Sequence, residues 1–292
     1  VIPSLQLSRY HNFLCGTISG CLARTITSPL DVIKLFIQVG IEQHSMWSYA
    51  KQIYRRDGFA GFWNGNIISV ANQGLYSGIK FLVVREIANL SSNPSHYTNF
   101  QAAMTGGVAG VLSQAAVFPM DLIRTRIILH PDKYHGFFQT AHLIMKEEGV
   151  SALWSGITPT IIGSIPYEGS QYLVYGQLRQ IIVERTKKPL TPLQNMLLGT
   201  CAGMISASMA YPFENIRKFM MTQNAQTHPD YSSMYGCMKY ILRTEGIGGL
   251  YKGVVLNAFK VIPYSALQYT LYDEVCKLFI KTKKIVEDVV EH

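Results

Sequence analysis

The fold of this 292-residue chain is decided by one stretch of sequence, Pro29-Leu30-Asp31-Val32-Ile33-Lys34. The stretch returns twice, at offsets of 90 and 93 residues, as Pro119-Met120-Asp121-Leu122-Ile123-Arg124 and as Pro212-Phe213-Glu214-Asn215-Ile216-Arg217. Self-similarity at a fixed period is the signature of tandem structural units. The sequence therefore predicts three copies of one unit, over residues 1–95, 96–190 and 191–292.

Two further signals repeat around each copy of the stretch. Thirteen residues before each proline stands a glycine, followed four residues later by a second glycine, as in Gly16 and Gly20. Small residues at this spacing let helix backbones approach closely in lipid, so we expect the glycine pairs at helix interfaces. Each stretch is also followed by an aromatic-x-Gly triplet: Trp63-Asn64-Gly65, Trp154-Ser155-Gly156 and Tyr251-Lys252-Gly253.

Composition places these units in a membrane. Apolar residues make up 48% of the chain and charged residues 15%, and the mean hydropathy of +0.13 indicates that some spans carry polar residues. Each unit is predicted to hold a long helix kinked at its proline, a short amphipathic helix and a second long helix. The predicted fold is an all-α membrane protein with six transmembrane helices, over residues 11–39, 67–90, 100–128, 158–183, 193–221 and 255–280. Each segment is long enough to cross about 30 Å of hydrocarbon.

Three other classes of protein fit the sequence less well. A soluble helical solenoid has no use for glycine pairs that lead into apolar runs such as residues 112–118. An enzyme is not indicated, because no Gly-rich phosphate loop, G-x-S-x-G or H-E-x-x-H motif occurs. Nucleic-acid binding is not indicated either, because much of the net charge of +8 lies in loops and in the tail Lys277 to Lys284, which suits lipid headgroups.

Cysteine and histidine patterns exclude a further set of sites. The five cysteines are scattered without a CxxC pair, and the eight histidines form no HxxxH or HxH cluster. We therefore expect reduced cysteines, no metal site and no resident cofactor.

The repeated Pro-x-acid-x-x-base stretch, together with the aromatic-x-Gly triplets, resembles the mitochondrial carrier family over essentially the whole chain. The resemblance implies a pseudo-threefold helix bundle, multi-pass in the mitochondrial inner membrane, that alternates between outward-open and inward-open states. It also implies transport or exchange of a small anionic solute by a monomeric chain. Membrane lipid is a further implied partner, with cardiolipin at the three aromatic-x-Gly triplets.

The charged residues of the repeated stretch have a physical role of their own. Within each copy the acid and the base lie three residues apart, so both project from nearly one helix face below a proline. Charges at membrane depth are costly unless they are paired. The resemblance implies a matrix gate of three ion pairs: Asp31 with Arg124, Asp121 with Arg217, and Glu214 with Lys34. It further implies that Gln38 braces one pair. The alternative is that these charges only stabilise helix packing or contact headgroups.

The gate that the family has on the cytoplasmic side is poorly preserved. At the corresponding positions only Arg179 and Asp273 carry the expected charge. We therefore expect a weaker seal on this side. A carrier-like scaffold that has lost transport is the alternative that this departure leaves open.

Substrate contacts are expected about midway along the even-numbered spans, as the resemblance implies. The residues at or beside those positions are Arg24, Asn72, Lys80, Gly163, Ser164, Tyr167, Lys260 and Tyr264. No acid matches the cations Arg24, Lys80 and Lys260, and unpaired cations at membrane depth mark an ion or substrate path. The two tyrosines, with Tyr76, either stack on a base, beside which Gly163 leaves room, or pack between helices.

Together these residues favour a phosphate-bearing anion of the nucleotide or coenzyme type. The pattern of Gly163 and Lys260 is similar to the branch of the family that carries adenine nucleotides and coenzyme A. Asn72 stands where most of that branch has arginine, and Lys80, two turns away, is expected to supply the missing charge. A carboxylate metabolite is the alternative, although such substrates favour the bidentate fork of arginine.

Overall fold

The computed structural model describes residues 9–40, 45–90, 99–187, 190–222 and 233–290, and this part of the chain forms helices without a strand. Six helices are long: α1 (Arg9–Val39), α3 (Asn66–Leu90), α4 (Asn99–Leu129), α6 (Ile157–Thr186), α7 (Pro192–Thr222) and α10 (Val254–Val290). Short helices separate the two long helices of each repeat: α2 (Met46–Asp57) with η2 (Phe59–Trp63), α5 (Phe137–Glu148) with η4 (Val150–Trp154), and α8 (Met234–Thr244) with α9 (Gly246–Leu250). The six predicted segments all lie in these long helices, although α10 runs ten residues further than the predicted end at residue 280.

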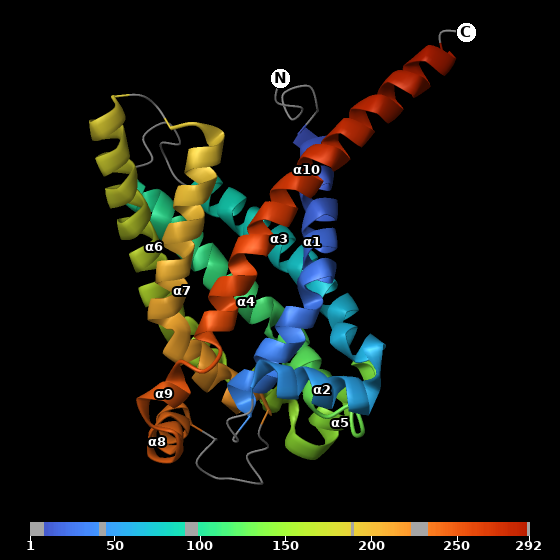
Figure 1. The fold of residues 1–292 in the computed structure, drawn as a ribbon, viewed down its shortest axis with the longest axis vertical. Helices are drawn as coiled ribbons and strands as arrows, with labels where there is room; N and C mark the ends of the chain where they lie inside the picture. Colours follow the sequence, from blue (N-terminus) through green and yellow to red (C-terminus); the bar gives the residue numbers. More distant parts are fainter. Residues whose placement is uncertain (1–8, 41–44, 91–98, 188–189, 223–232, 291–292) are drawn as a thin grey trace.

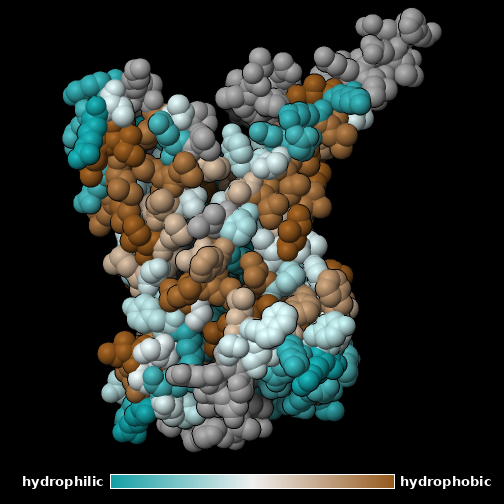
Figure 2. Space-filling model, in the orientation of Figure 1, coloured by the Kyte–Doolittle hydropathy of each residue, from teal (hydrophilic) through white to brown (hydrophobic). Residues whose placement is uncertain are grey.

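Three segments of the described residues are both long and apolar enough to cross a membrane: Phe59–Ile87, Met104–Leu129 and Gln194–Thr222. These segments belong to the first, second and third repeats. The space-filling view agrees with this finding, because apolar side chains form a broad band across the middle of the molecule and polar ones gather toward both ends (Figure 2).

The long helices pack as three neighbouring pairs, each taken from two repeats or from the two ends of the chain. The most extensive contacts join α3 with α4, α6 with α7, and α10 with α1. The helices that contain the repeated stretch, α1, α4 and α7, also contact one another. Figure 1 shows the short helices gathered around one end of the bundle, here called the short-helix end. The first turns of α1 and the last turns of α10 lie at the opposite, terminal end (Figure 1), where the surface is hollowed between α6 and α7 on one side and α1 and α10 on the other (Figure 2).

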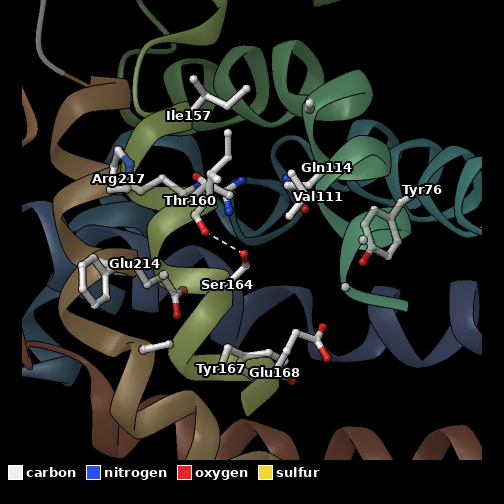
Figure 3. A pocket seen from close by; sticks show the side chains of 18 residues that line it. Tyr76, Val111, Gln114, Ile157, Thr160, Ser164, Tyr167, Glu168, Glu214 and Arg217 are labelled. Atoms are coloured by element: carbon white, nitrogen blue, oxygen red, sulfur yellow. Dashed lines mark hydrogen bonds between the residues drawn. The ribbon is translucent and has the colours of Figure 1, made fainter. Parts of the chain in front are cut away.

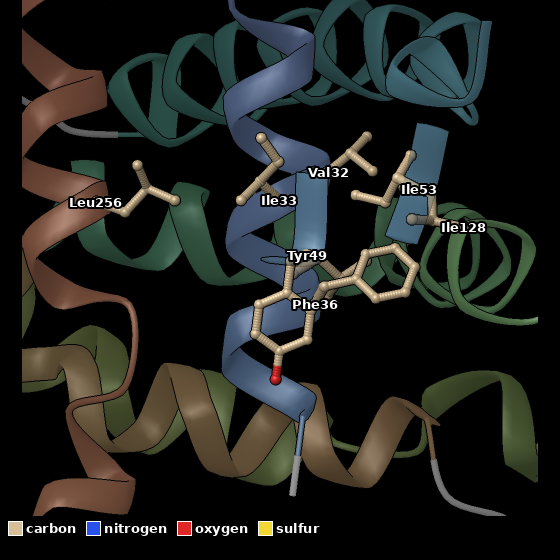
Figure 4. Close-up of a cluster of buried hydrophobic side chains, with 8 residues drawn as sticks. Val32, Ile33, Phe36, Tyr49, Ile53, Ile128 and Leu256 are labelled. Carbon is tan, nitrogen blue, oxygen red and sulfur yellow. The ribbon is translucent and has the colours of Figure 1, made fainter. Parts of the chain in front are cut away.

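Each repeat has its own apolar cluster at the short-helix end. In the first, Phe36 of α1 packs with Tyr49 and Ile53 of α2 and with Ile128 from the next repeat (Figure 4). The second cluster likewise takes Met221 from the third repeat. Because every cluster combines a long helix with its short helices, the amphipathic short helices fix the ends of the kinked ones.

Gln38 stands at the position that Ile128 and Met221 occupy in the other repeats, and it is almost completely buried. Its Nε2 donates to Asn215 Oδ1 at 2.9 Å and to Tyr211 Oη at 3.3 Å. Asn215 Nδ2 in turn donates to the backbone carbonyl of Leu250 at 2.9 Å. The third junction between repeats is therefore a satisfied polar network in place of an apolar contact.

In the first two repeats, the kink prolines leave backbone carbonyls that the tryptophans of the aromatic-x-Gly triplets satisfy. A proline has no N–H, so the carbonyl four residues before it loses its helical donor. Trp63 Nε1 donates to the carbonyl of Thr25, four residues before Pro29, at 2.9 Å. Trp154 Nε1 donates to the carbonyl of Ala115 at 3.2 Å in the second repeat. The third repeat has Tyr251 at this place, and its ring has no N–H.

The two sets of repeated glycines have opposite surroundings. Gly65 has a φ of +72°, and a Cβ there would lie 2.9 Å from Arg124 Cγ, so this position requires glycine. Among the described residues, a Cβ at Gly16, Gly106 or Gly199 would meet nothing within 4 Å. The prediction that the glycine pairs lie at helix interfaces is therefore wrong for these three glycines in this conformation, because the helices diverge toward the terminal end. A Cβ at Gly110 would lie 3.6 Å from Tyr76 Oη of α3, so this member of the second pair does face a neighbouring helix.

Candidate functional site

Ion pairs join α1, α4 and α7, the helices that contain the repeated stretch, toward the short-helix end, and this group of charged side chains is here called the ionic base. Lys34 Nζ lies 2.8 Å from Glu214 Oε1, joining α1 to α7. Arg217 of α7 pairs with Asp121 of α4, and Lys218 Nζ lies 3.5 Å from the same carboxylate. These are two of the three pairings that the resemblance implied. The side chains are 11 to 33% exposed, so these charges are largely removed from solvent.

The third predicted pairing is wrong, because Asp31 pairs with Lys260 of α10 and not with Arg124. Helices α1 and α10 lie side by side, and the long lysine stem reaches the carboxylate from there. Arg124 makes no ion pair within 4 Å in the part of the chain that the structure describes. Its Nε is buried without an acceptor, although Asp31 and Asp121 lie within its electrostatic range.

Gln38 does not hydrogen-bond to a charged member of an ion pair. Its hydrogen-bond partner Tyr211 contacts the ion pair instead, because Lys34 Nζ lies 5.3 Å from the centroid of the Tyr211 ring. Gln38 thus lies beneath the pair of Lys34 and Glu214 and reaches it through Tyr211. Gln38 therefore does not brace an ion pair directly, as the resemblance had implied.

A pocket of about 330 Å³ lies directly above this ionic base, between α4, α6 and α7 with Tyr76 from α3. Figure 3 shows Ser164, Tyr167 and Glu168 of α6 on one wall, with Gln114 of α4 across from them. The ion-paired residues Glu214 and Arg217 also line it, and the other lining residues are Gly107, Gly110, Val111, Ala115, Ile157, Pro159, Thr160, Ile161, Gly163, Ala210 and Phe213. A solute in this pocket therefore touches the charges that hold the helices together.

Gly163 serves a helix contact and does not leave room for a ring. A Cβ at this position would lie 2.6 Å from Phe213 Cβ. The missing side chain lets α6 approach α7, and Phe213 fills the space that the sequence suggested for a base. The prediction about the space beside Gly163 is wrong for this reason, although Gly163 itself lines the pocket.

Three of the remaining predicted contact residues are cations, Arg24, Lys80 and Lys260, and the two lysines lie beside tyrosine rings. Lys260 Nζ lies 5.8 Å from the centroid of the Tyr264 ring, and Lys80 Nζ lies 5.7 Å from that of Tyr76. Arg24 donates to Gln73 of α3 and has no ion pair among the described residues. Of the three cations expected to be unpaired, Lys260 is paired, so that expectation is wrong for it.

Asn72 faces a neighbouring helix. Its Nδ2 donates to the backbone carbonyl of Val117 in α4 at 3.2 Å, which leaves its second N–H and its Oδ1 for other partners. Ser164 Oγ similarly donates to the carbonyl of Ile161 at 2.7 Å. Both side chains keep one acceptor for a solute after these bonds.

Sequence reasoning missed two charged residues of the site. Lys218 shares Asp121 with Arg217, and the only signal for it was its place directly after the repeated stretch. Glu168 lines the pocket and is exposed there, directly after the predicted contact Tyr167. The pocket thus contains an acid that the search for repeat-related positions did not select.

The terminal end has a different character. Arg179 and Asp273 do not pair with each other in this conformation. The one ion pair that the described residues form there joins Lys277 and Glu274 within α10, with both side chains more than half exposed. Tyr175 of α6 and Asn195 of α7 are hydrogen-bonded at 3.3 Å. This end of the site is therefore open to solvent.

The family model described as mitochondrial carrier protein matches residues 5–94, 95–186 and 188–283. The chain is 30% identical to the mitochondrial coenzyme A transporter of Rattus norvegicus over 90% of the chain and 86% of that protein. It is 28% identical to solute carrier family 25 member 43 of Danio rerio, over 93% of the chain and 82% of the relative. It is 32% identical to the mitochondrial adenyl nucleotide antiporter of Danio rerio, over 88% of the chain and 56% of the relative.

Proposed function

Because the chain belongs to the mitochondrial carrier family, whose members are multi-pass transporters of the mitochondrial inner membrane, we propose that it moves a phosphate-bearing, nucleotide- or coenzyme-like anion. In this proposal the solute enters the pocket from the terminal end, and the ionic base at the short-helix end then opens to release it. The short-helix end faces the matrix. The observation that carries the proposal is the surplus of cations in the ionic base beneath the pocket.

The lengths of the helices support six membrane spans. The shortest of the long helices, α3, has 25 residues. At a rise of about 1.5 Å per residue it is about 37 Å long, which exceeds the roughly 30 Å of bilayer hydrocarbon. The polar residues that lower the hydropathy of the other spans, such as Lys34 and Lys260, belong to the ionic base and so face protein and not lipid.

The net charge of the ionic base supports an anionic solute. The ionic base contains three carboxylates and five cations, which leaves two positive charges in excess: Asp31, Asp121 and Glu214 with Lys34, Arg124, Arg217, Lys218 and Lys260. Arg24 adds a further cation, and its Nε is buried without an acceptor among the described residues. Surplus charge at membrane depth is costly until a solute of the opposite sign neutralises it.

The walls of the pocket support a solute with a planar ring. Tyr76 and Tyr167 both line it, beside hydrogen-bonding groups of Gln114 and Ser164. Stacking of a base on an aromatic side chain contributes about 1 to 3 kcal/mol and tolerates any base. Two relatives named above are a coenzyme A transporter and an adenyl nucleotide antiporter, and both of those solutes contain adenine and phosphate.

In the proposed alternating access, the glycines at the terminal end become contacts between helices. When the terminal end closes, Gly16, Gly106 and Gly199 are the positions at which α1, α4 and α7 approach, since nothing occupies that space now. Arg179 and Asp273 then contribute to the seal on that side. The aromatic-x-Gly triplets bind cardiolipin through backbone amides in this proposal, because the indole N–H groups of Trp63 and Trp154 already donate to backbone carbonyls.

Uptake into liposomes tests the function. The purified chain is reconstituted and offered radiolabelled ATP, coenzyme A, and di- and tricarboxylates. We expect uptake of a nucleotide or a coenzyme A derivative, strongly reduced in Lys260→Ala and in Arg24→Ala. Lys277→Ala is the matched control, since it removes an exposed lysine from the same helix as Lys260.

Two outcomes contradict the proposal. Uptake of carboxylates alone, with failure of every nucleotide and coenzyme A derivative, assigns the site to a carboxylate metabolite. Uptake of nothing under any gradient assigns the chain to a carrier-like scaffold without transport.

A further inference from the structure

One face of α6 lines the pocket with side chains that can only accept hydrogen bonds from a solute. Thr160, Ser164 and Glu168 are spaced four residues apart, so they share one side of the helix, and all three line the pocket (Figure 3). The Thr160 hydroxyl donates to the backbone carbonyl of Gly156 at 2.9 Å. The Ser164 hydroxyl donates to that of Ile161 at 2.7 Å. Because each hydroxyl proton is engaged, both oxygens offer a solute only their lone pairs.

Glu168 is the charged acceptor of this face. Its side chain is exposed in the pocket and makes no ion pair or hydrogen bond within the part of the chain that the structure describes. A carboxylate accepts hydrogen bonds and cannot donate them, and it repels a phosphate or the oxygen of a ring carbonyl. Glu168 is therefore unfavourable in a pocket for an anion, unless the cargo turns a hydrogen-bond donor toward it.

Glu168 and the ionic base lie at different levels of the pocket. Gly156, directly before α6, faces the backbone of Arg217, since a Cβ there would lie 3.1 Å from the Arg217 carbonyl oxygen. Glu168 comes roughly three turns later, or about 18 Å nearer to the terminal end along the helix. Figure 3 accordingly shows Glu168 well apart from Arg217 and next to Tyr167. A cargo whose phosphate points toward the ionic base thus has its ring beside Tyr167 and one ring edge at Glu168.

We propose that Glu168 reads the edge of this ring and selects a ring with an amino group, as in adenine, over one with a carbonyl group at the same place. The amino group donates to the Glu168 carboxylate, and the oxygens of Ser164 and Thr160 accept from hydroxyl groups of the same cargo. Gln114, across the pocket, can donate or accept through its amide and so does not discriminate. The inference rests on the proposed function, because it takes a phosphate-bearing cargo with a planar ring as its premise.

Binding of matched nucleotides to the purified full-length chain, measured by calorimetry, tests the selection. ADP, IDP and purine riboside 5′-diphosphate carry an amino group, a carbonyl oxygen or a hydrogen at the same ring carbon. We expect the wild type to bind ADP about tenfold more tightly than either analogue, because both analogues lose a hydrogen bond to a charged acceptor. IDP should bind most weakly of the three, since its carbonyl oxygen faces the carboxylate.

Glu168→Gln should remove the preference, because a glutamine amide can donate to the carbonyl of IDP or accept from the amino group of ADP. ADP should bind about fivefold more weakly than to the wild type and IDP more tightly, so that the two differ by less than about twofold. Glu184→Gln is the matched control. Glu184 is an exposed glutamate of α6 outside the pocket, where it accepts from Gln180 Nε2 at 2.8 Å, and its variant should keep the wild-type preference.

Three results overturn the inference. The first is equal binding of the three nucleotides to the wild type, and the second is an unchanged preference in Glu168→Gln. The third is a gain of ADP and IDP binding alike in Glu168→Gln, because the carboxylate then acts only as a charge that repels phosphate. The liposome assay separates this inference from the function: uptake of ADP and IDP at the same rate overturns only the selection by Glu168, whereas absence of both binding and uptake for every nucleotide overturns the proposed function with it.

Discussion

The two ends of the helix bundle come from the same three repeats but are held together in different ways. At the short-helix end, α1, α4 and α7 meet through ion pairs, and an apolar cluster lies in each repeat. At the terminal end the described residues form one ion pair, and it lies within a single helix. A repeated sequence therefore produces one sealed end and one open end, because it places partners for its charges at one end only.

The largest expected effect is the difference in stability loss when a carboxylate is removed at each end. Asp121→Ala leaves Arg217 and Lys218 without their carboxylate in a site that is only 13 to 18% exposed. Removing one partner of such a buried group destabilises by about 3 to 5 kcal/mol. Asp273→Ala at the open end should cost much less, because this half-buried carboxylate has no ion pair to lose among the described residues. Thermal unfolding of both variants in detergent measures the difference, and equal losses would show that the ends are not held differently.

Glycine substitutions give the next largest contrast, and they differ in sign. Gly65→Ala forces a side chain into a left-handed conformation, at a cost of about 1 to 2 kcal/mol, and brings its Cβ to 2.9 Å from Arg124 Cγ. Gly106→Ala has open space and a helical backbone, so it should stabilise this conformation by about 0.5 to 1 kcal/mol. The same variant should slow transport, since the proposed closure needs that space. A destabilised Gly106→Ala with full transport would contradict the account.

The kinks provide a smaller contrast between repeats. Trp63→Phe removes the donor to the Thr25 carbonyl and should cost about 1 kcal/mol, because an acceptor is left unsatisfied. Tyr251→Phe in the third repeat removes a hydroxyl that makes no hydrogen bond in the described part of the chain, so we expect almost no change. Unfolding temperatures of the two variants measure the difference. A loss of the same size in Tyr251→Phe would contradict the claim that the indole N–H stabilises the kink by binding the free carbonyl.

The smallest expected effect concerns pH at the short-helix end. His130 follows the last turn of α4, and desolvation together with Arg126, Arg56 and Lys133 lowers its pKa. The unfolded chain, with an ordinary value of about 6.5, then binds the proton more readily than the folded chain. Stability from the neutral imidazole is present above that value and is lost as the pH falls below it. The free energy of unfolding between pH 7.5 and 5.5 should therefore depend less on pH in His130→Asn than in the wild type. An unchanged dependence would show that His130 does not contribute to it.

Much of the fold could be predicted from the sequence because the repeat carries it. The proline positions and the apolar lengths of the segments located all six long helices, and the resemblance implied the pairs of Lys34 with Glu214 and of Asp121 with Arg217. Repeat symmetry also produced the main error. The threefold gate that the resemblance implied assigned Asp31 to Arg124, whereas Lys260 of the adjacent α10 takes the carboxylate. Lys260 has no cationic counterpart in the other repeats, where Asn72 and Gly163 stand at its position.

Other features of the site depend on information that a single sequence does not contain. Whether a glycine pair is packed or open depends on which end of the bundle is closed. Whether Gly163 faces a solute or a helix depends on the side chain opposite, and Phe213 is fifty residues away in the chain. Periodicity predicts which residues share a face, but distances between helices decide what each residue touches.

Labelling from each side of the membrane tests the central claim most directly. A single cysteine is introduced as Ser164→Cys, in the pocket, after the five native cysteines are replaced by serine. The chain is reconstituted in one orientation and exposed to a membrane-impermeant maleimide without cargo. We expect labelling from the terminal side only, and labelling from both sides once Asp121→Asn is added. Equal labelling of Ser164→Cys from the short-helix side, with the ionic base intact, would contradict the claim that these ion pairs seal the pocket.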